Sequence, residues 1–392
     1  MSELLYPGLL RHTVSLSMLD DFLLWAVGMG ASDIVLRAED PPWIQKDGVW
    51  HATSTVFCLT QGETQMLTNA LSGQEHKAGN VQRGMSADFA YSLRPPNTKV
   101  MQRFRVNVTA TNVGHYIVLR PLPRVLPRLE DQALPKHLCA QCFPDNGLVV
   151  IAGVMGSGKS TLLAALLHAA ICKKAYGGLG IGRQVLTLEQ PIEFDLTSLP
   201  CHQRSAPLAQ SEVERHISSW PHGVRSMTRR KGEIVMLGEA RDEETLAAML
   251  SIVEQGVTCY ATVHAEDVAK TIPRIVNTFP QDERESRALS VYAHLRLILH
   301  QRLVPHRDPS LGRIALREYV IVDEALRREL SAHPFARCIP LLRKAMQRQG
   351  QSIVDDVTAK FAQGLVSAET YDRILREQEG HSKGGGDGSA VA

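Results

Sequence analysis

The chain has 392 residues, of which 44% are hydrophobic and 21% are charged. This length suits two domains with tails, and this composition excludes general disorder. The 43 basic and 41 acidic residues leave a formal charge of +2, so no net field requires nucleic acid or an anionic membrane as a partner. The sequence has no apolar run of the roughly 20 residues that span a bilayer. We therefore expect a soluble or peripheral protein of the cytoplasm.

The first 120 residues predict a compact α+β domain. Apolar residues recur at helical spacing over 14–30, which predicts an amphipathic helix. Residues 31–50 alternate in polarity and contain an Asp-Gly turn, which predicts a β-hairpin. A second helix is expected over 59–73, and the further strands expected are 88–93, 101–111 and 115–122.

The composition changes over residues 121–135, which are rich in proline. Proline stiffens the chain and opposes regular structure, so this segment is predicted to be an interdomain linker. Beyond it, fully apolar strands alternate with helices, which indicates a parallel sheet covered on both faces. The expected strands are 147–153, 184–190, 233–239 and 257–264, and the expected helices are 159–174 and 243–254.

The second domain is predicted to span residues 136–347. Its last part, from 281 onward, is expected to be helical with one hairpin-like interruption at 312–323. A helical extension is expected over 348–380. Residues 381–392 are rich in glycine and have no apolar residues to anchor them, so we expect a disordered tail there.

A glycine-rich segment at 153–161 carries the clearest chemical signal. GVMGSGKST matches the phosphate-binding P-loop pattern G-x-x-x-x-G-K-[ST], and it lies between an apolar strand and a helix, as that motif requires. Its glycines let backbone amides turn toward phosphate oxygens, Lys159 would neutralise the β and γ phosphates, and Ser160 would bind Mg²⁺. The predicted nucleotide-binding residues of this segment are Gly153, Gly156, Ser157, Gly158, Lys159, Ser160 and Thr161.

Three polar side chains follow apolar strands of the same domain. Glu189, Glu239 and His264 each end such a strand, so they are predicted to meet the P-loop at one edge of the sheet. Hydrolysis of ATP needs a carboxylate to orient or activate water, and we predict that Glu239 is this base. Acids at strand ends also serve as helix caps or ion-pair partners, and a single histidine in a loop is more often structural. The shared edge favours catalysis.

Four segments in this order resemble the motifs of the secretion ATPase superfamily. The match is to the branch that contains the pilus-retraction ATPase PilT and the Dot/Icm and conjugation ATPases DotB and TraJ. It covers about residues 20–345 and implies a RecA-like P-loop ATPase domain, preceded by a smaller PAS-like α+β domain. The segments that resemble the Walker A, Asp box, Walker B and His box motifs are, in turn, 147–167, 186–194, 234–245 and 261–280.

This resemblance implies roles for individual residues. Glu239 falls on the water-activating glutamate, His264 on the His-box histidine, and Glu189 on the Asp-box glutamate, which would hold Mg²⁺ together with Ser160. Two arginines of the N-terminal domain reach the nucleotide phosphates in relatives. They match Arg105 and Arg120, which the residues alone would predict to be ordinary exposed strand arginines.

The resemblance also implies a function. It predicts a homo-hexameric motor that uses ATP and Mg²⁺ at the cytoplasmic face of a secretion, conjugation or pilus apparatus, peripherally associated with the inner membrane. Residue 190 is Gln where relatives usually have Asp, so a metal or water role at that position does not carry over. The insertion at 195–216 favours a type IVB secretion or conjugation system.

Two other functions are compatible with a P-loop. A RecA-like motor that translocates nucleic acid would need loops rich in basic and aromatic residues. Aromatic residues make up only 5% of this chain and its obvious basic cluster, 229–231, adjoins Walker B, so we do not expect nucleic acid to be required. A nucleotide-gated scaffold with low turnover would have no need of Glu239.

Overall fold

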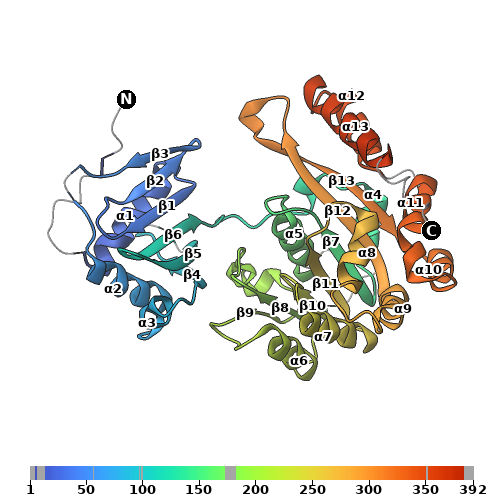
Figure 1. Cartoon of the computed structure of the whole chain (residues 1–392), viewed down its shortest axis with the longest axis horizontal. Coiled ribbons are helices and arrows are strands. Elements are labelled where there is room, and N and C mark those ends of the chain that lie inside the picture. The colour runs from blue at the N-terminus through green and yellow to red at the C-terminus, as the bar shows by residue number, and fades with distance from the viewer. Residues whose placement is uncertain are drawn as a thin grey trace, which may run out of the picture. The chain divides into compact units, whose positions relative to one another are not determined.

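The structure is a computed structural model that describes residues 5–6, 14–55, 57–96, 98, 100–172, 182–349 and 352–383. Its elements are labelled in Figure 1. Two compact units divide the chain between them. The first unit comprises Met1–Leu126, Glu189–Ser198 and Glu212–Ser218, and the second comprises Pro127–Leu188, Leu199–Ser211 and Ser219–Ala392.

The first unit is built on a six-stranded antiparallel sheet with the order β3-β2-β1-β6-β5-β4. Its strands are β1 (Asp33–Arg37), β2 (Trp43–Lys46), β3 (Val49–Ala52), β4 (Ala87–Leu93), β5 (Gln102–Thr111) and β6 (Gly114–Pro121). The hairpin predicted over 31–50 is the β2–β3 pair, and β1 precedes it as a third strand. Asp47 and Gly48 turn this hairpin with φ of 51° and 80°, the left-handed conformation that Asp-Gly turns favour.

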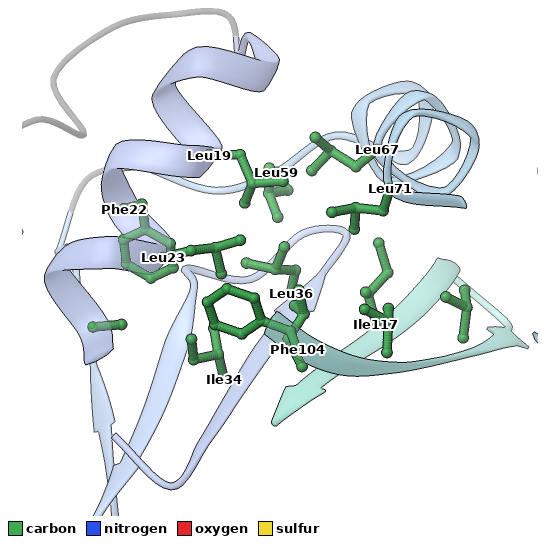
Figure 2. Packing of buried hydrophobic residues seen from close by; sticks show 14 of the residues in the cluster. Leu19, Phe22, Leu23, Ile34, Leu36, Leu59, Leu67, Leu71, Phe104 and Ile117 are labelled. Atoms are coloured by element: carbon green, nitrogen blue, oxygen red, sulfur yellow. The ribbon is translucent and has the colours of Figure 1, made fainter. Parts of the chain in front are cut away.

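Two helices pack apolar side chains against the sheet of this unit (Figure 2). They are α1 (Leu16–Gly28) and α2 (Gln61–Ser72), which confirm the two helices predicted from periodicity; α3 (Lys77–Gln82) follows them. Phe22 of α1 and Leu67 of α2 are almost fully buried against Phe104 of β5 and its neighbours. Burial of one such side chain contributes about 1.5–3 kcal/mol.

Two segments from later in the sequence pack within the first unit. Glu212 is only 1% exposed; its carboxylate accepts a hydrogen bond from the Ala90 N–H at 3.1 Å and lies 3.7 Å from the guanidinium of Arg103. Arg215 donates to the carbonyl of Ala90 at 3.2 Å. The first unit is therefore formed by three separate stretches of the sequence and not by one continuous segment.

The second unit contains a seven-stranded sheet with the order β13-β12-β7-β11-β10-β8-β9. Neighbouring pairs among β12, β7, β11, β10 and β8 are parallel, and all residues of the central strands β7, β11, β10 and β8 are buried. This confirms the predicted, mostly parallel sheet. The strands are β7 (Gly147–Ala152), β8 (Val185–Glu189), β9 (Leu208–Glu212), β10 (Ile234–Leu237), β11 (Thr258–Val263), β12 (Leu295–Pro305) and β13 (Arg313–Ile321).

Helices alternate with these strands (Figure 1). The helix predicted from residue 159 ends at Ile171, and the helix predicted over 243–254 has those bounds. Among the described residues, no helix is both long and apolar enough to cross a membrane. The helices are α4 (Lys136–Gln141), α5 (Lys159–Ile171), α6 (Trp220–Arg229), α7 (Glu243–Glu254), α8 (Val268–Val276), α9 (Arg284–His294), α10 (Glu324–Ser331) and α11 (Cys338–Gln349).

The helical prediction for residues 281–347 is wrong between 295 and 305. These residues form β12, which pairs in parallel with β7 and antiparallel with β13. The predicted interruption at 312–323 is the second arm of this β12–β13 hairpin. A short apolar run fits a buried helix and a buried strand equally well, and here the free edge of β7 decides in favour of the strand.

Two helices follow, α12 (Ile353–Ala362) and α13 (Ala368–Lys383), and they pack on the β12–β13 hairpin. Arg302 of β12 forms an ion pair of 2.6 Å with Glu377 of α13. Because α13 continues to Lys383, residues 381–383 of the predicted disordered tail are helical; residues 384–392 lie outside the described residues. The apolar residues shared by hairpin and helices are Val304, Leu316, Ile353, Val357, Val366 and Ile374.

Candidate functional site

The P-loop turns between β7 and α5 on three glycines. Gly153, Gly156 and Gly158 have φ of 147°, 73° and 83°, backbone angles that residues with a Cβ rarely adopt. A Cβ on Gly153 would lie 2.4 Å from the carbonyl oxygen of Gln301, and one on Gly158 would lie 2.8 Å from the Nε2 of Gln301. Glycine is therefore needed at two of these positions for the close approach of β12 as well as for the turn.

Lys159 closes this loop from the first position of α5. It is 9% exposed, and its Nζ donates to the carbonyls of Gly153 and Val154, both at 2.8 Å. The hydroxyl of Ser157 is buried without a hydrogen-bond partner among the described residues. An ammonium group, an unused hydroxyl and the amides at the start of a helix together fit a polyphosphate.

Glu239 and His264, the predicted catalytic pair, lie in contact. Glu239 follows β10, and His264 comes directly after β11, the strand between β10 and β7. The Nε2 of His264 is 2.9 Å from the Oε1 of Glu239, and Arg241 pairs with the same oxygen. Since all three strands are parallel, both side chains lie at the edge of the sheet where the P-loop begins.

The environment of His264 keeps its ring neutral at neutral pH. Burial lowers the pKa of His264, the positive charges of Lys159 and Arg241 lower it further, and Glu239 raises it in part. A neutral ring whose Nε2 contacts a carboxylate oxygen carries its proton on Nε2. The effect of Lys159 on this pKa also shows that His264 lies within the field of the P-loop lysine.

Glu189, the predicted Asp-box residue, is the last residue of β8, and β8 lies next to β10. It is 8% exposed, and its backbone carbonyl accepts a hydrogen bond from Val213 at 2.9 Å. Its charge acts on Arg103: burial lowers the pKa of that guanidinium, and Glu212, Asp195 and Glu189 raise it. The strand of Glu189 therefore lies next to β10 in the parallel part of the sheet, which continues with β11. The three acids stabilise the charged form of Arg103, a residue of the first unit.

Arg103 lies two residues before Arg105, the arginine that the sequence analysis selected. Residues two apart on a strand share a face, so the sequence Arg-Phe-Arg already offered both. Arg105 pairs with Asp88 through two contacts of 3.2 and 2.6 Å, and Arg120 pairs with Asp33 at 2.9 Å. Arg105 and Arg120 are cross-strand neighbours, and their role toward a nucleotide stays a prediction.

Two buried side chains that the sequence analysis missed support the P-loop. The Nε2 of Gln301, on β12, donates to the carbonyl of Ser157 at 2.7 Å. The Nε of Arg317, on β13, donates to the Oε1 of Gln301 at 2.7 Å. Gln301 and Arg317 are 2% and 7% exposed. Both strands carry further polar residues, so the sequence offered no distinct signal for these two positions.

A cavity of about 760 Å³ lies beside the P-loop within the second unit. Gly158 and Thr161 line it on one side and residues 131–135 on another, with Gln301 and Arg317 between them. Ligand pockets are typically about 300–1,000 Å³, so this cavity is large enough for a nucleoside.

The residues present also fit a magnesium ion of the P-loop type. Among the described residues, no group of three or more His, Cys, Asp and Glu side chains is arranged to hold a metal ion. Magnesium in such sites is held by few protein ligands together with phosphate oxygens and water. Ser160, exposed in the first turn of α5, offers the hydroxyl that this arrangement needs.

A P-loop after β7, an acid after β10 and a histidine after β11 on a mainly parallel sheet define a RecA-like P-loop ATPase fold. Residues 96–338 match the model of the type II/IV secretion system protein family, and the chain belongs to this family. The predicted resemblance to the secretion ATPase superfamily is thereby confirmed.

Individual relatives agree with this assignment. A solved structure of the ATPase DotB from Legionella pneumophila is 32% identical, covers 94% of this chain and 97% of its own, and has a TM-score of 0.84. A structure of the pilus retraction motor PilT with bound ADP is 27% identical over 89% of this chain and 94% of its own, with a TM-score of 0.74. The type IV pilus retraction ATPase PilT of Pseudomonas aeruginosa is 28% identical over 349 residues, 89% of this chain and 95% of that protein. The match to DotB confirms the predicted branch.

Proposed function

We propose that this chain hydrolyses ATP with Mg²⁺ and acts as a homo-hexameric motor in a type IVB-like secretion or conjugation system. One observation carries the proposal: the carboxylate of Glu239 lies 2.9 Å from His264, whose pKa is lowered in part by Lys159. Membership of a secretion and pilus ATPase family and the likeness to DotB support it further. We place the motor at the cytoplasmic face of the inner membrane, as a peripheral protein, with no requirement for nucleic acid.

The P-loop binds the polyphosphate. Lys159 exchanges the carbonyls of Gly153 and Val154 for phosphate oxygens, which are stronger acceptors because they are charged. Ser157 gains a partner for its buried hydroxyl. The nucleoside occupies the cavity beside Thr161.

Glu239 orients and activates the attacking water. Its carboxylate accepts the proton that water loses, while the Nε2–H of neutral His264 holds the carboxylate in one orientation. Ser160 and Glu189 would hold the metal ion. When bound, Mg²⁺ neutralises charge that develops on the phosphates.

Arg105 and Arg120 add positive charge from the first unit. Their present partners, Asp88 and Asp33, form partly exposed ion pairs, which contribute only about 0–1 kcal/mol. Exchange of these partners for phosphate therefore costs little.

Electron microscopy with and without ATP tests the hexamer: six-membered rings are expected, and monomers at saturating ATP would contradict it.

The substitution Glu239→Gln tests the proposed chemistry. It removes the base but keeps the shape, so we expect kcat for ATP hydrolysis to fall at least about 100-fold while nucleotide affinity stays within about threefold. Phosphate release and equilibrium binding measure the two effects. Glu244→Gln, the same change at an exposed position of α7, is the control and leaves both unchanged. Unchanged turnover in Glu239→Gln would instead support a nucleotide-gated scaffold.

A further inference from the structure

We propose that Gln301 and Arg317 are positioning residues that couple the P-loop to the linker segment 127–135. When nucleotide occupies the P-loop, this pair holds the linker segment in place, and without the pair the segment no longer responds to nucleotide. The inference rests on the proposed nucleotide binding but does not require hydrolysis.

Three consecutive hydrogen bonds join the two segments within the second unit. Gln301 donates to the carbonyl of Ser157 at 2.7 Å, and Arg317 donates through its Nε to the side-chain oxygen of Gln301 at 2.7 Å. The Nη1 of Arg317 donates to the carbonyl of Gln132 at 2.6 Å. One guanidinium and one amide thus connect a main-chain carbonyl of the P-loop with a main-chain carbonyl of the linker segment.

The geometry leaves the amide of Gln301 one usable orientation. Its oxygen must face the guanidinium of Arg317, which has only donors, and its nitrogen must face the carbonyl of Ser157, which only accepts. Both side chains are more than nine-tenths buried, so water cannot replace a lost partner. Movement of the P-loop carbonyl is therefore transmitted to Arg317.

Arg317 is itself firmly held. Its backbone N–H donates to the Oδ2 of Asp356 on α12 at 2.7 Å, and Lys360 pairs with the same carboxylate oxygen. Burial lowers the pKa of Arg317 to about 10, and the charge of Asp356 opposes this shift, so the guanidinium remains positive at neutral pH. With its backbone fixed from α12, its side chain acts as a bridge between the P-loop and the end of a 3-10 helix, Glu130–Gln132, in the linker segment.

We expect binding at one end of such a bridge to affect the other end, and this coupling to be reciprocal. Phosphate binding draws Lys159 away from the carbonyls of Gly153 and Val154 and orders the loop around the phosphate. The carbonyl of Ser157 then presents a fixed acceptor to Gln301. The segment held by Arg317 at Gln132 becomes ordered with it.

Limited trypsin digestion of the full chain measures this coupling at Arg128, which is exposed in the linker segment. In the wild type, saturating Mg-ADP is expected to slow cleavage at Arg128 at least fivefold. Arg317→Met and Gln301→Glu are each expected to raise the Kd for Mg-ADP about tenfold and, at saturating Mg-ADP, to abolish this protection. The double variant binds Mg-ADP no more weakly than either single variant, because both cut the same path.

Two comparison variants separate coupling from packing. Arg302→Met removes a guanidinium from the same hairpin, where it pairs with Glu377, and is expected to leave both Kd and protection as in the wild type. Arg317→Lys keeps a donor and restores part of the protection. Gln301→Glu preserves size and the acceptor for Arg317, so it carries the test if Arg317→Met does not fold.

The proposal is overturned if wild-type chain binds Mg-ADP but Arg128 is cleaved equally fast with and without it; the proposed nucleotide site then stands. It is also overturned if a folded Arg317→Met or Gln301→Glu variant keeps full protection, or if Arg302→Met loses protection to the same extent. A wild type that does not bind Mg-ADP overturns this inference and the proposed function together.

Discussion

The carboxyl edge of the second unit's sheet and the arginine pairs of the first unit differ in how firmly their charged groups are held. Lys159, Gln301 and Arg317 are buried and bound to main-chain or amide oxygens. Arg105 and Arg120 are 40% and 64% exposed and paired with aspartates. We propose that the first group, the fixed region, is positioned before phosphate binds. The second group, the exchangeable region, can change partners at little cost.

The largest effect is expected from Lys159, the centre of the fixed region. Lys159→Met removes the charge that faces the phosphates, so we expect the Kd for Mg-ATP to rise at least 100-fold, which corresponds to about 2.7 kcal/mol. Calorimetric titration measures this loss. Lys344→Met, at an exposed lysine paired with Glu329, should bind as the wild type does. Equal affinity in the two variants would show that the fixed region does not bind phosphate.

Glu318, the residue after Arg317 on β13, gives the stability of the chain a pH dependence. Its carboxylate accepts a hydrogen bond from the Val268 N–H at the start of α8. Burial raises the pKa of Glu318 to about 7, against backbone hydrogen bonds that lower it. Between about pH 4.5 and pH 7, the folded chain therefore keeps the Glu318 proton that the unfolded chain releases. The contribution of Glu318 to the free energy of unfolding is present at low pH and is lost as pH rises from about 4.5 to about 7.

Glu318→Gln should remove that loss, because glutamine stays neutral and still accepts from Val268. We expect the variant to gain on the order of 2 kcal/mol over the wild type at pH 8 and nothing at pH 4. Denaturant unfolding at both pH values measures the difference. A gain that is equal at both pH values would assign the effect to packing.

His264 is expected to have an intermediate effect. His264→Ala removes the Nε2–H that holds Glu239, so kcat should fall about tenfold with little change in KM. His264→Gln places an amide N–H near the position of Nε2 and should recover part of the loss. If glutamine were no better than alanine, the contact with Glu239 would have no part in the reaction.

The smallest effect is expected in the exchangeable region. Asp88→Asn frees Arg105 from its ion pair, so stability should fall by less than about 1 kcal/mol and the KM for ATP should decrease about twofold. Thermal unfolding and steady-state kinetics measure the two changes. Asp40→Asn, which breaks the Arg37 pair on the same unit, should leave KM unaltered. A KM that rises in Asp88→Asn would count against a role for Arg105 in phosphate binding.

The sequence predicted the parts of the site that follow one another along the chain. The P-loop is a local pattern, and Glu239 and His264 each end a buried strand, so parallel pairing alone brings them to one edge. Gln301 was missed because its partner, Ser157, is distant in sequence, and because β12 itself was predicted to be helical. Arg317 was missed for the same reason, since only the paired hairpin brings it to Gln301. The positions of both residues at the P-loop depend on the pairing of β12 with β7 and β13.

We propose that the edge formed by β7, β10 and β11 binds and hydrolyses ATP. Titration of Mg-ATP into Glu239→Gln, together with phosphate release by the wild type, tests it most directly. We expect one tightly bound ATP per chain that persists in the variant and is turned over in the wild type. Absence of Mg-ATP binding to either protein, or equal phosphate release by both, would contradict it.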